Sequence, residues 1–85
     1  MRGMSAFPSM KASALERLLM REPLNYSVQR RSGSHRRLVS PDFPALTFAY
    51  HDGVTIAPGL VRKILVKDVG LSHDEALGLI RRESR

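Results

Sequence analysis

The strongest constraint on the fold is a pair of short segments, residues 26–31 and 35–40, separated only by Ser32, Gly33 and Ser34. Segments of this length that alternate polar and apolar side chains are typical of half-buried strands. The small residues between them suit a tight turn, and Gly33 supplies the backbone freedom that a turn needs. The sequence therefore predicts a β-hairpin.

Alternation along a strand also predicts which hairpin side chains share a face. In the first strand we expect Tyr26, Val28 and Arg30 on one side. In the second strand the expected sets are Arg36, Leu38 and Ser40 on one side and His35, Arg37 and Val39 on the other. Each strand carries two apolar anchors, so the pattern leaves open which side is buried.

Helical patterns precede and follow the hairpin. The first helix is expected from Pro8 or Ser9 to a position before Pro23, because an apolar stripe with helical spacing lies between them and proline disfavours helix continuation. The stripe consists of Ala14, Leu15, Leu18 and Leu19. A later helix is expected from Pro58 to a C-cap at Gly70.

Two further elements are expected in the second half. Leu46, Phe48 and Tyr50 alternate with polar or small residues and predict a third strand. Ser72 and Glu75 have the spacing of a capping box, which predicts a short third helix. The resulting order, helix, three strands and one or two helices, predicts an α+β fold with one sheet face covered and the other open to a ligand.

The length of 85 residues allows one modest core and therefore one domain. We expect a flexible leader over residues 1–8, the domain over 9–81 and a flexible tail over 82–85. With no cysteine in the chain, disulfides, thiolate catalysis and cysteine zinc sites are excluded. No segment has the length and apolar character of a signal peptide or a membrane span, so we expect a cytoplasmic protein without membrane contact.

The net charge is +6, and 11 of the 14 cationic side chains are arginine. Arginine suits bidentate contact with phosphate, so an anionic partner is expected. The densest group, Arg30, Arg31, Arg36 and Arg37, surrounds the hairpin turn and places cations on both faces of the strands. A polyanion such as RNA would neutralise this repulsion. A membrane surface, an acidic protein and an ordinary exposed hairpin are the alternatives.

His35 is the candidate for chemistry. Cleavage of RNA by its own 2′-hydroxyl needs a base, an acid and a cation at the phosphate, and imidazole exchanges a proton near neutral pH. The alternative is an ordinary polar strand residue. His51 is the better candidate for a second acid or base, whereas His73 is expected on the surface. Neither the histidine spacing nor the scattered aspartates predict a metal site, and no cofactor is expected.

The hairpin with Gly33, Ser34 and His35, the segment 56–65 and the segment 69–72 together resemble the HicA toxin family. The resemblance covers nearly all of residues 11–80. It implies a fold like that of double-stranded-RNA-binding domains, cleavage of mRNA with a catalytic histidine at His35, and a partner antitoxin of the HicB type that covers the site. Where many members carry histidine or an apolar residue after the catalytic histidine, this chain has Arg36.

The leading hypothesis is therefore a metal-independent endoribonuclease toxin that forms a hetero-oligomer with its antitoxin. His35 is its predicted catalytic residue, and the predicted RNA-binding residues are Arg30, Arg31, Gly33, Ser34, Arg36 and Arg37. Two alternatives remain open at this point. The first is a non-catalytic RNA-binding domain, and the second is a basic protein-interaction module.

Overall fold

The computed structural model describes residues 7–49 and 53–83. The elements follow in the order β1 (Met10–Lys11), α1 (Ala12–Met20), β2 (Ser27–Ser32), β3 (His35–Val39), β4 (Leu46–Ala49), β5 (Thr55–Ile56), α2 (Pro58–Arg62), the π-helix η1 (Lys63–Asp68) and α3 (His73–Glu83). A helix, an antiparallel sheet and further helices confirm the predicted α+β class. The arrangement is consistent with the fold of double-stranded-RNA-binding domains.

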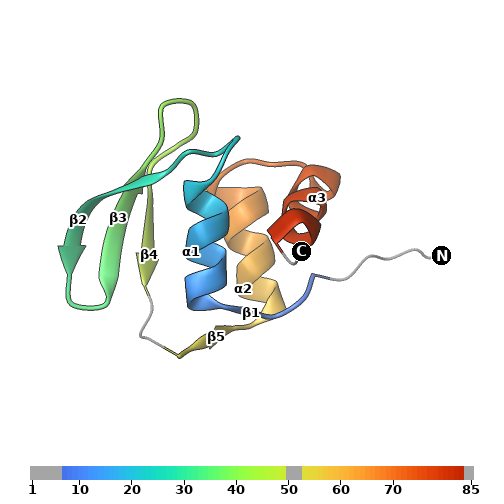
Figure 1. The fold of residues 1–85 in the computed structure, drawn as a ribbon, viewed down its shortest axis with the longest axis horizontal. Coiled ribbons are helices and arrows are strands. Elements are labelled where there is room, and N and C mark those ends of the chain that lie inside the picture. The colour runs from blue at the N-terminus through green and yellow to red at the C-terminus, as the bar shows by residue number, and fades with distance from the viewer. Residues whose placement is uncertain (1–6, 50–52, 84–85) are drawn as a thin grey trace.

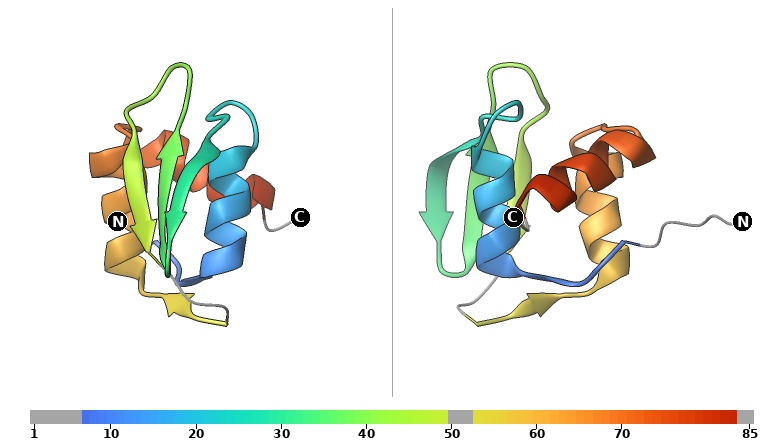
Figure 2. Two further views of the ribbon diagram at one scale, coloured as in Figure 1. Left: turned by 90° about the vertical axis from the view of Figure 1, so that its left-hand side faces the viewer. Right: turned by 45° about the vertical axis from the view of Figure 1, so that its right-hand side comes forward.

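The main sheet has the strand order β2-β3-β4, and both neighbouring pairs are antiparallel. The helices lie behind one face of this sheet, with α1 and α2 side by side and α3 beyond them (Figure 1). When the molecule is turned by 90° so that the sheet faces the viewer, the three strands stand in front of the helical layer (Figure 2, left). One face of the sheet is therefore packed on helices and the other is open, as the element order predicts.

The core lies between the sheet and the helices. The sheet contributes Leu38, Leu46 and Phe48, which are at most 5% exposed. The helices contribute side chains at helical spacing, among them Leu15, Leu18, Leu19, Val61, Ile64 and Leu65. Among the described residues, no polar or charged residue is fully buried. Leu38 and Phe48 alternate with Arg37 and Thr47, whose exposed side chains lie on the open face of the sheet.

A β-bulge interrupts the pairing of β2 with β3. Val28 lies opposite Leu38, whereas Arg30 lies opposite Arg37, so the register shifts by one residue at Gln29. The extra residue reverses the alternation of β2, because directly opposed residues share a face. The expectation that Val28 and Arg30 lie on the same side is therefore wrong. The predicted alternation of β3 is correct, with Leu38 buried and Arg37 exposed.

The first helix begins later than its sequence pattern predicts. Residues 10 and 11 form a strand that pairs with β5, and the backbone N–H of Ala12 donates to the carbonyl of Val54 at 2.9 Å. The predicted start at Pro8 or Ser9 is therefore wrong, because pairing with β5 holds Met10 and Lys11 in an extended conformation. The end of the helix at Met20, before Pro23, agrees with the prediction.

The helices of the second half confirm the predicted helix-end signals. Ser72 and Glu75 form the expected capping box, in which the Glu75 N–H donates to Ser72 Oγ at 3.1 Å and the Ser72 N–H donates to Glu75 Oε1 at 2.9 Å. Gly70 follows the preceding helix with a φ of +94°. The last part of that helix is a π-helix, which the sequence did not predict. Its final hydrogen bond joins the Val69 N–H to the Ile64 carbonyl.

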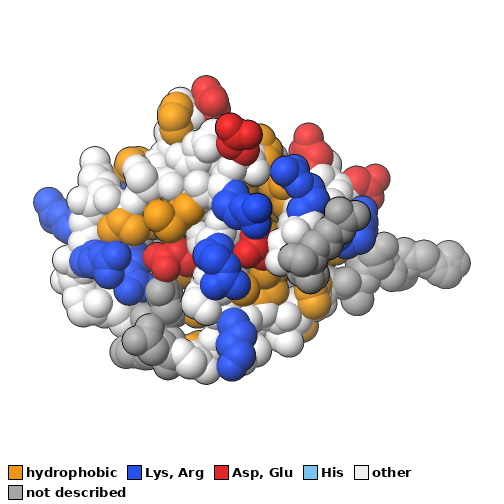
Figure 3. Space-filling view, in the orientation of Figure 1, with side chains coloured by type: hydrophobic (Ala, Val, Ile, Leu, Met, Phe, Trp, Pro, Cys, Tyr) orange, Lys and Arg blue, Asp and Glu red, His pale blue; other side chains and the backbone are white. Residues whose placement is uncertain are grey.

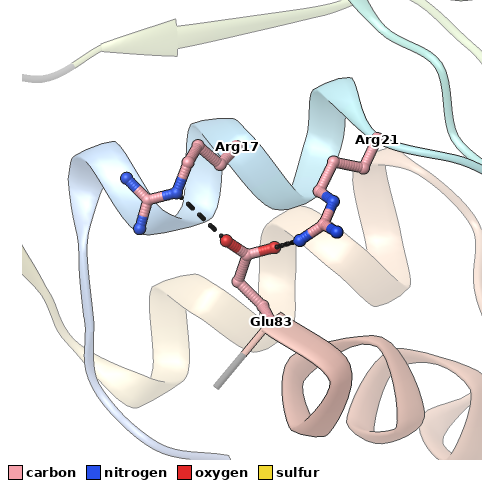
Figure 4. A network of polar contacts seen from close by, with 3 residues as sticks. All are labelled: Arg17, Arg21 and Glu83. Atoms are coloured by element: carbon pink, nitrogen blue, oxygen red, sulfur yellow. Dashed lines mark hydrogen bonds and ion pairs between the residues drawn. The ribbon is translucent and has the colours of Figure 1, made fainter. Parts of the chain in front are cut away.

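Residues near both ends of the chain contact the folded part. Phe7, within the expected leader, is buried, and its ring meets that of His73 edge-on at a centroid distance of 5.0 Å. Glu83, within the expected tail, accepts hydrogen bonds from Arg17 and Arg21 at 3.1 Å each and ties α3 to α1 (Figure 4). No helix in residues 7–49 and 53–83 is long and apolar enough to cross a membrane.

Candidate nucleic-acid interface

The hairpin turn places His35 at the first position of β3. Gly33 has a φ of +62°, and Ser34 is outside the left-handed region, which is the φ pattern of a type II′ turn. Ser32 and His35 are the last opposed pair before the turn. His35 is exposed, and Ser34 is half-buried. The geometry of a two-residue turn thus presents the histidine at the rim of the sheet.

The open face of the sheet gathers His35 with two of the predicted arginines. Arg37 follows on the same side of β3, and Arg30 lies directly opposite Arg37 because of the bulge. Thr47 of β4 is opposite Arg37 on the other side. These residues line a shallow hollow together with Gln29 and Ser32. Directly opposed residues have Cα atoms about 4.5–5.5 Å apart, so their side chains can reach one bound group.

Sequence reasoning missed three side chains of this hollow. Thr47 precedes inward-facing Phe48, so alternation on the third strand already placed it on the open face. Ser32 was assigned to the turn, although it is the last residue of β2. Gln29 reaches the hollow through the bulge, which no sequence pattern predicts. The lining of the hollow therefore includes three neutral hydrogen-bonding side chains that the prediction from the arginine cluster did not contain.

The electrostatics of the open face favour an anion. Arg30 and Arg37 are directly opposed like charges, and neither has a carboxylate partner within the described part of the chain. Opposed like charges destabilise a sheet, and a phosphate between them would remove the repulsion while accepting several hydrogen bonds. The pair is therefore suited to bind phosphate beside His35.

The other two hairpin arginines lie on the opposite side of the strands. Arg36 points toward α1, where its Nε lies 3.6 Å from Oε2 of Glu16. Arg31 is opposite Arg36 and is exposed on the edge strand β2. The six predicted RNA-binding residues thus separate into two on the open face, two in the turn and two on the far side.

Of the other two histidines, His73 is within the described residues, and it does not line the hollow. His51 lies outside the described residues, so its predicted role as a second acid or base stays a prediction. His73 begins α3 and contacts Phe7. In the described ranges, no three His, Asp or Glu side chains are grouped closely enough to hold a metal ion.

Cations are also present away from the sheet. In the view of Figure 3, Lys and Arg side chains gather over α1 and α3. Arg17 and Arg21 belong to this group, with side chains 63% and 67% exposed, but both bind Glu83. Carboxylates therefore offset part of the charge on the helical face, in contrast to Arg30 and Arg37.

Fold and surface together define a small α+β domain with an open basic sheet face that carries His35. The sequence profile of the HicA toxin of bacterial toxin–antitoxin systems matches residues 12–71, which include the whole sheet and the helices α1 and α2. The chain therefore belongs to the HicA toxin family, as the resemblance predicted. It is the toxin of a toxin–antitoxin system, and an antitoxin partner is implied. Neither curated proteins nor solved structures give a match.

Proposed function

We propose that this toxin is a metal-independent endoribonuclease that cleaves mRNA on the open face of its sheet, with His35 as the catalytic residue. The observation that carries the proposal is the placement of His35 on the same face as Arg30 and Arg37. The substrate RNA implies a cytoplasmic site of action. The antitoxin, proposed to be of the HicB type, inhibits the toxin by covering this face.

The reaction is an attack of the RNA on its own phosphodiester. The 2′-oxygen forms a bond to phosphorus while the bond from phosphorus to the 5′-oxygen breaks, which gives a 2′,3′-cyclic phosphate and a 5′-hydroxyl end. The proton of the 2′-hydroxyl leaves to a base, and the departing 5′-oxygen takes up a proton from an acid. The imidazole of His35 performs one of these transfers.

Arg30 and Arg37 stabilise the charge that develops on the phosphorane. The two residues occupy opposed positions on neighbouring strands, so both guanidinium groups can reach the phosphate on which the charge appears. Ser32 and Thr47 line the same hollow, and their hydroxyls are suited to donate hydrogen bonds to phosphate oxygens. Gly33 and Ser34 shape the turn that presents His35.

The test is RNA cleavage by purified toxin in the presence of a chelator. Wild type is expected to cut the RNA, and His35→Ala is expected to cut at least about 100-fold more slowly, as for loss of a general acid or base. His73→Gln, which changes a histidine outside the hollow, is the matched control and should cleave at the wild-type rate. RNA whose 2′-hydroxyl at the cut site is replaced by hydrogen should stay intact.

Three outcomes would contradict the proposal. Cleavage by His35→Ala at the wild-type rate removes His35 from the mechanism. If the chelator abolishes activity and added metal restores it, the reaction is metal-catalysed and the proposed chemistry is wrong. Tight binding of RNA that stays intact over long incubation identifies a non-catalytic RNA-binding domain.

A further inference from the structure

Arg36 is enclosed between the sheet and α1. Its side chain is 16% exposed, and the partner Glu16 is 17% exposed, with 3.6 Å between Arg36 Nε and Glu16 Oε2. The adjacent Arg37, in contrast, lies on the open face and is exposed. RNA lying on the open face is therefore on the opposite side of β3 from the Arg36 side chain.

The pair lies on the inward side of β3, beside residues of the apolar core. On the inward side of β3, Leu38 is fully buried and lies between Val28 and Leu46. One step closer to the turn, the inward residue is Arg36, opposite Phe48. Glu16 occupies the matching place on α1, next to buried Leu15. The ion pair is thus the last inward contact of β3 before His35.

We propose that the Glu16–Arg36 ion pair positions His35, and that Arg36 does not bind RNA. The pair holds the turn-proximal end of β3 on α1, so that the His35 side chain on the opposite face keeps its place relative to Arg30 and Arg37. This inference rests on the proposed endoribonuclease function. Arg36 is a positioning residue in this scheme, because it acts through the backbone of β3.

Two physical arguments support this role. Removing one member of a buried ion pair leaves the other charge uncompensated, which strains the contact, whereas replacing both members by apolar side chains is often neutral. Catalysis is sensitive to displacements of about 1 Å, which can lower rates by roughly 100-fold. The pair is therefore expected to affect turnover far more than RNA affinity.

The experiment compares Arg36→Met, Glu16→Leu and the double variant with Arg37→Met, a matched loss of the neighbouring arginine. Turnover at saturating RNA gives kcat, and binding of 2′-deoxy-blocked RNA over a range of salt gives the number of phosphate contacts. Arg37→Met is expected to weaken binding and to reduce the salt slope by about 0.7. Arg36→Met and Glu16→Leu should keep the wild-type slope and lose kcat by roughly tenfold to 100-fold.

Glu16→Leu and the double variant make the test decisive. Removing the negative charge of Glu16 should, by electrostatics alone, strengthen RNA binding. A lower kcat in Glu16→Leu therefore cannot come from weaker RNA binding and indicates a change in the position of His35. The double variant should recover most of the kcat that either single variant loses. Arg36→Lys, which keeps the charge but not the guanidinium, replaces Arg36→Met if that variant does not fold, and it should also lose kcat at an unchanged slope.

A reduced salt slope in Arg36→Met, equal to that of Arg37→Met, would show that Arg36 binds phosphate and would overturn the inference. A double variant as slow as the single variants would overturn it as well. If the wild type itself does not cleave RNA, the proposed function fails, and the NMR signals of the His35 ring decide the inference separately. They are expected to shift in both single variants and to return in the double variant, with the His73 ring as reference; unchanged signals would contradict positioning.

Discussion

Gly33 occupies a backbone conformation that side chains with a Cβ atom rarely adopt. Its φ is +62°, and beyond its two chain neighbours no heavy atom of the described residues lies within 4 Å of the position that a Cβ would take. Any cost of a substitution there comes from the backbone alone. Because the turn presents His35, this strain also bears on the geometry of the proposed catalytic site.

We expect Gly33→Ala to lower the free energy of unfolding by about 1 kcal/mol, since an L-residue is disfavoured in the left-handed region. Gly33→Asn should cost less, because asparagine tolerates this region better. Urea unfolding measures both, with the midpoint expected to fall at an unchanged m-value. An unchanged midpoint for Gly33→Ala would show that the turn relaxes to another type.

Tyr26 links the start of the hairpin to the segment before β4. Its side chain is 2% exposed, and its hydroxyl donates to the Pro44 carbonyl at 2.6 Å. Burial, reinforced by the negative charge of Asp68, raises the pKa of Tyr26 above its ordinary value of 10.0. The neutral phenol is thus the form that the folded state stabilises.

Tyr26→Phe is expected to lower the free energy of unfolding by about 1 kcal/mol near neutral pH, because the hydrogen bond is lost. Since the pKa is higher in the folded state than in the unfolded state, the contribution of Tyr26 is complete below about pH 10 and declines as pH rises through the folded value. Unfolding measured from pH 7 to 11 should show this decline in wild type and not in the variant. Parallel curves for the two proteins would contradict the assignment.

At the scale of elements, features that depend on sequence neighbours were predicted correctly. Features that depend on a distant segment of the chain were not. The capping box at Ser72 and the alternation of Leu46 with Phe48 depend on neighbours within a few residues, and both are confirmed. The pairing of β1 with β5 and the bulge at Gln29 depend on segments far apart or on a partner strand. The bulge decides which arginines accompany His35, so the composition of the hollow could not be read from alternation alone.

The helix α3 contains one residue that weakens it. Gly78 lies in its interior, and a Cβ there would meet no heavy atom of the described residues within 4 Å, apart from its chain neighbours and the backbone of its own helix. Glycine within a helix costs roughly 0.5–1 kcal/mol relative to alanine. Gly78→Ala is therefore expected to raise the free energy of unfolding by about that amount in urea unfolding. The same substitution at Gly33 should have the opposite sign, and destabilisation by Gly78→Ala would reveal a packing constraint at this position.

At the scale of the whole molecule, the helices and the open sheet face have separate tasks. The helical layer buries the apolar face of the sheet, and α3 is attached to α1 through Glu83. Predicting this division from sequence was possible because the order of helices and strands leaves one face without a cover. Predicting where the cations lie was not, because the basic side chains of the described residues lie both on the open sheet face and on its helical side.

The separation of faces predicts different effects for two similar arginines. Arg30, on the open face, should contact an RNA phosphate, whereas Arg81 lies on α3, within the helical layer. Each phosphate contact to single-stranded RNA contributes about 0.7 to the slope of log affinity against log salt. Arg30→Gln is therefore expected to reduce the slope by about 0.7, and Arg81→Gln should leave it unchanged, although both remove one charge. Equal reductions would mean that RNA also follows the basic surface over α1 and α3, and that net charge rather than the sheet face governs binding.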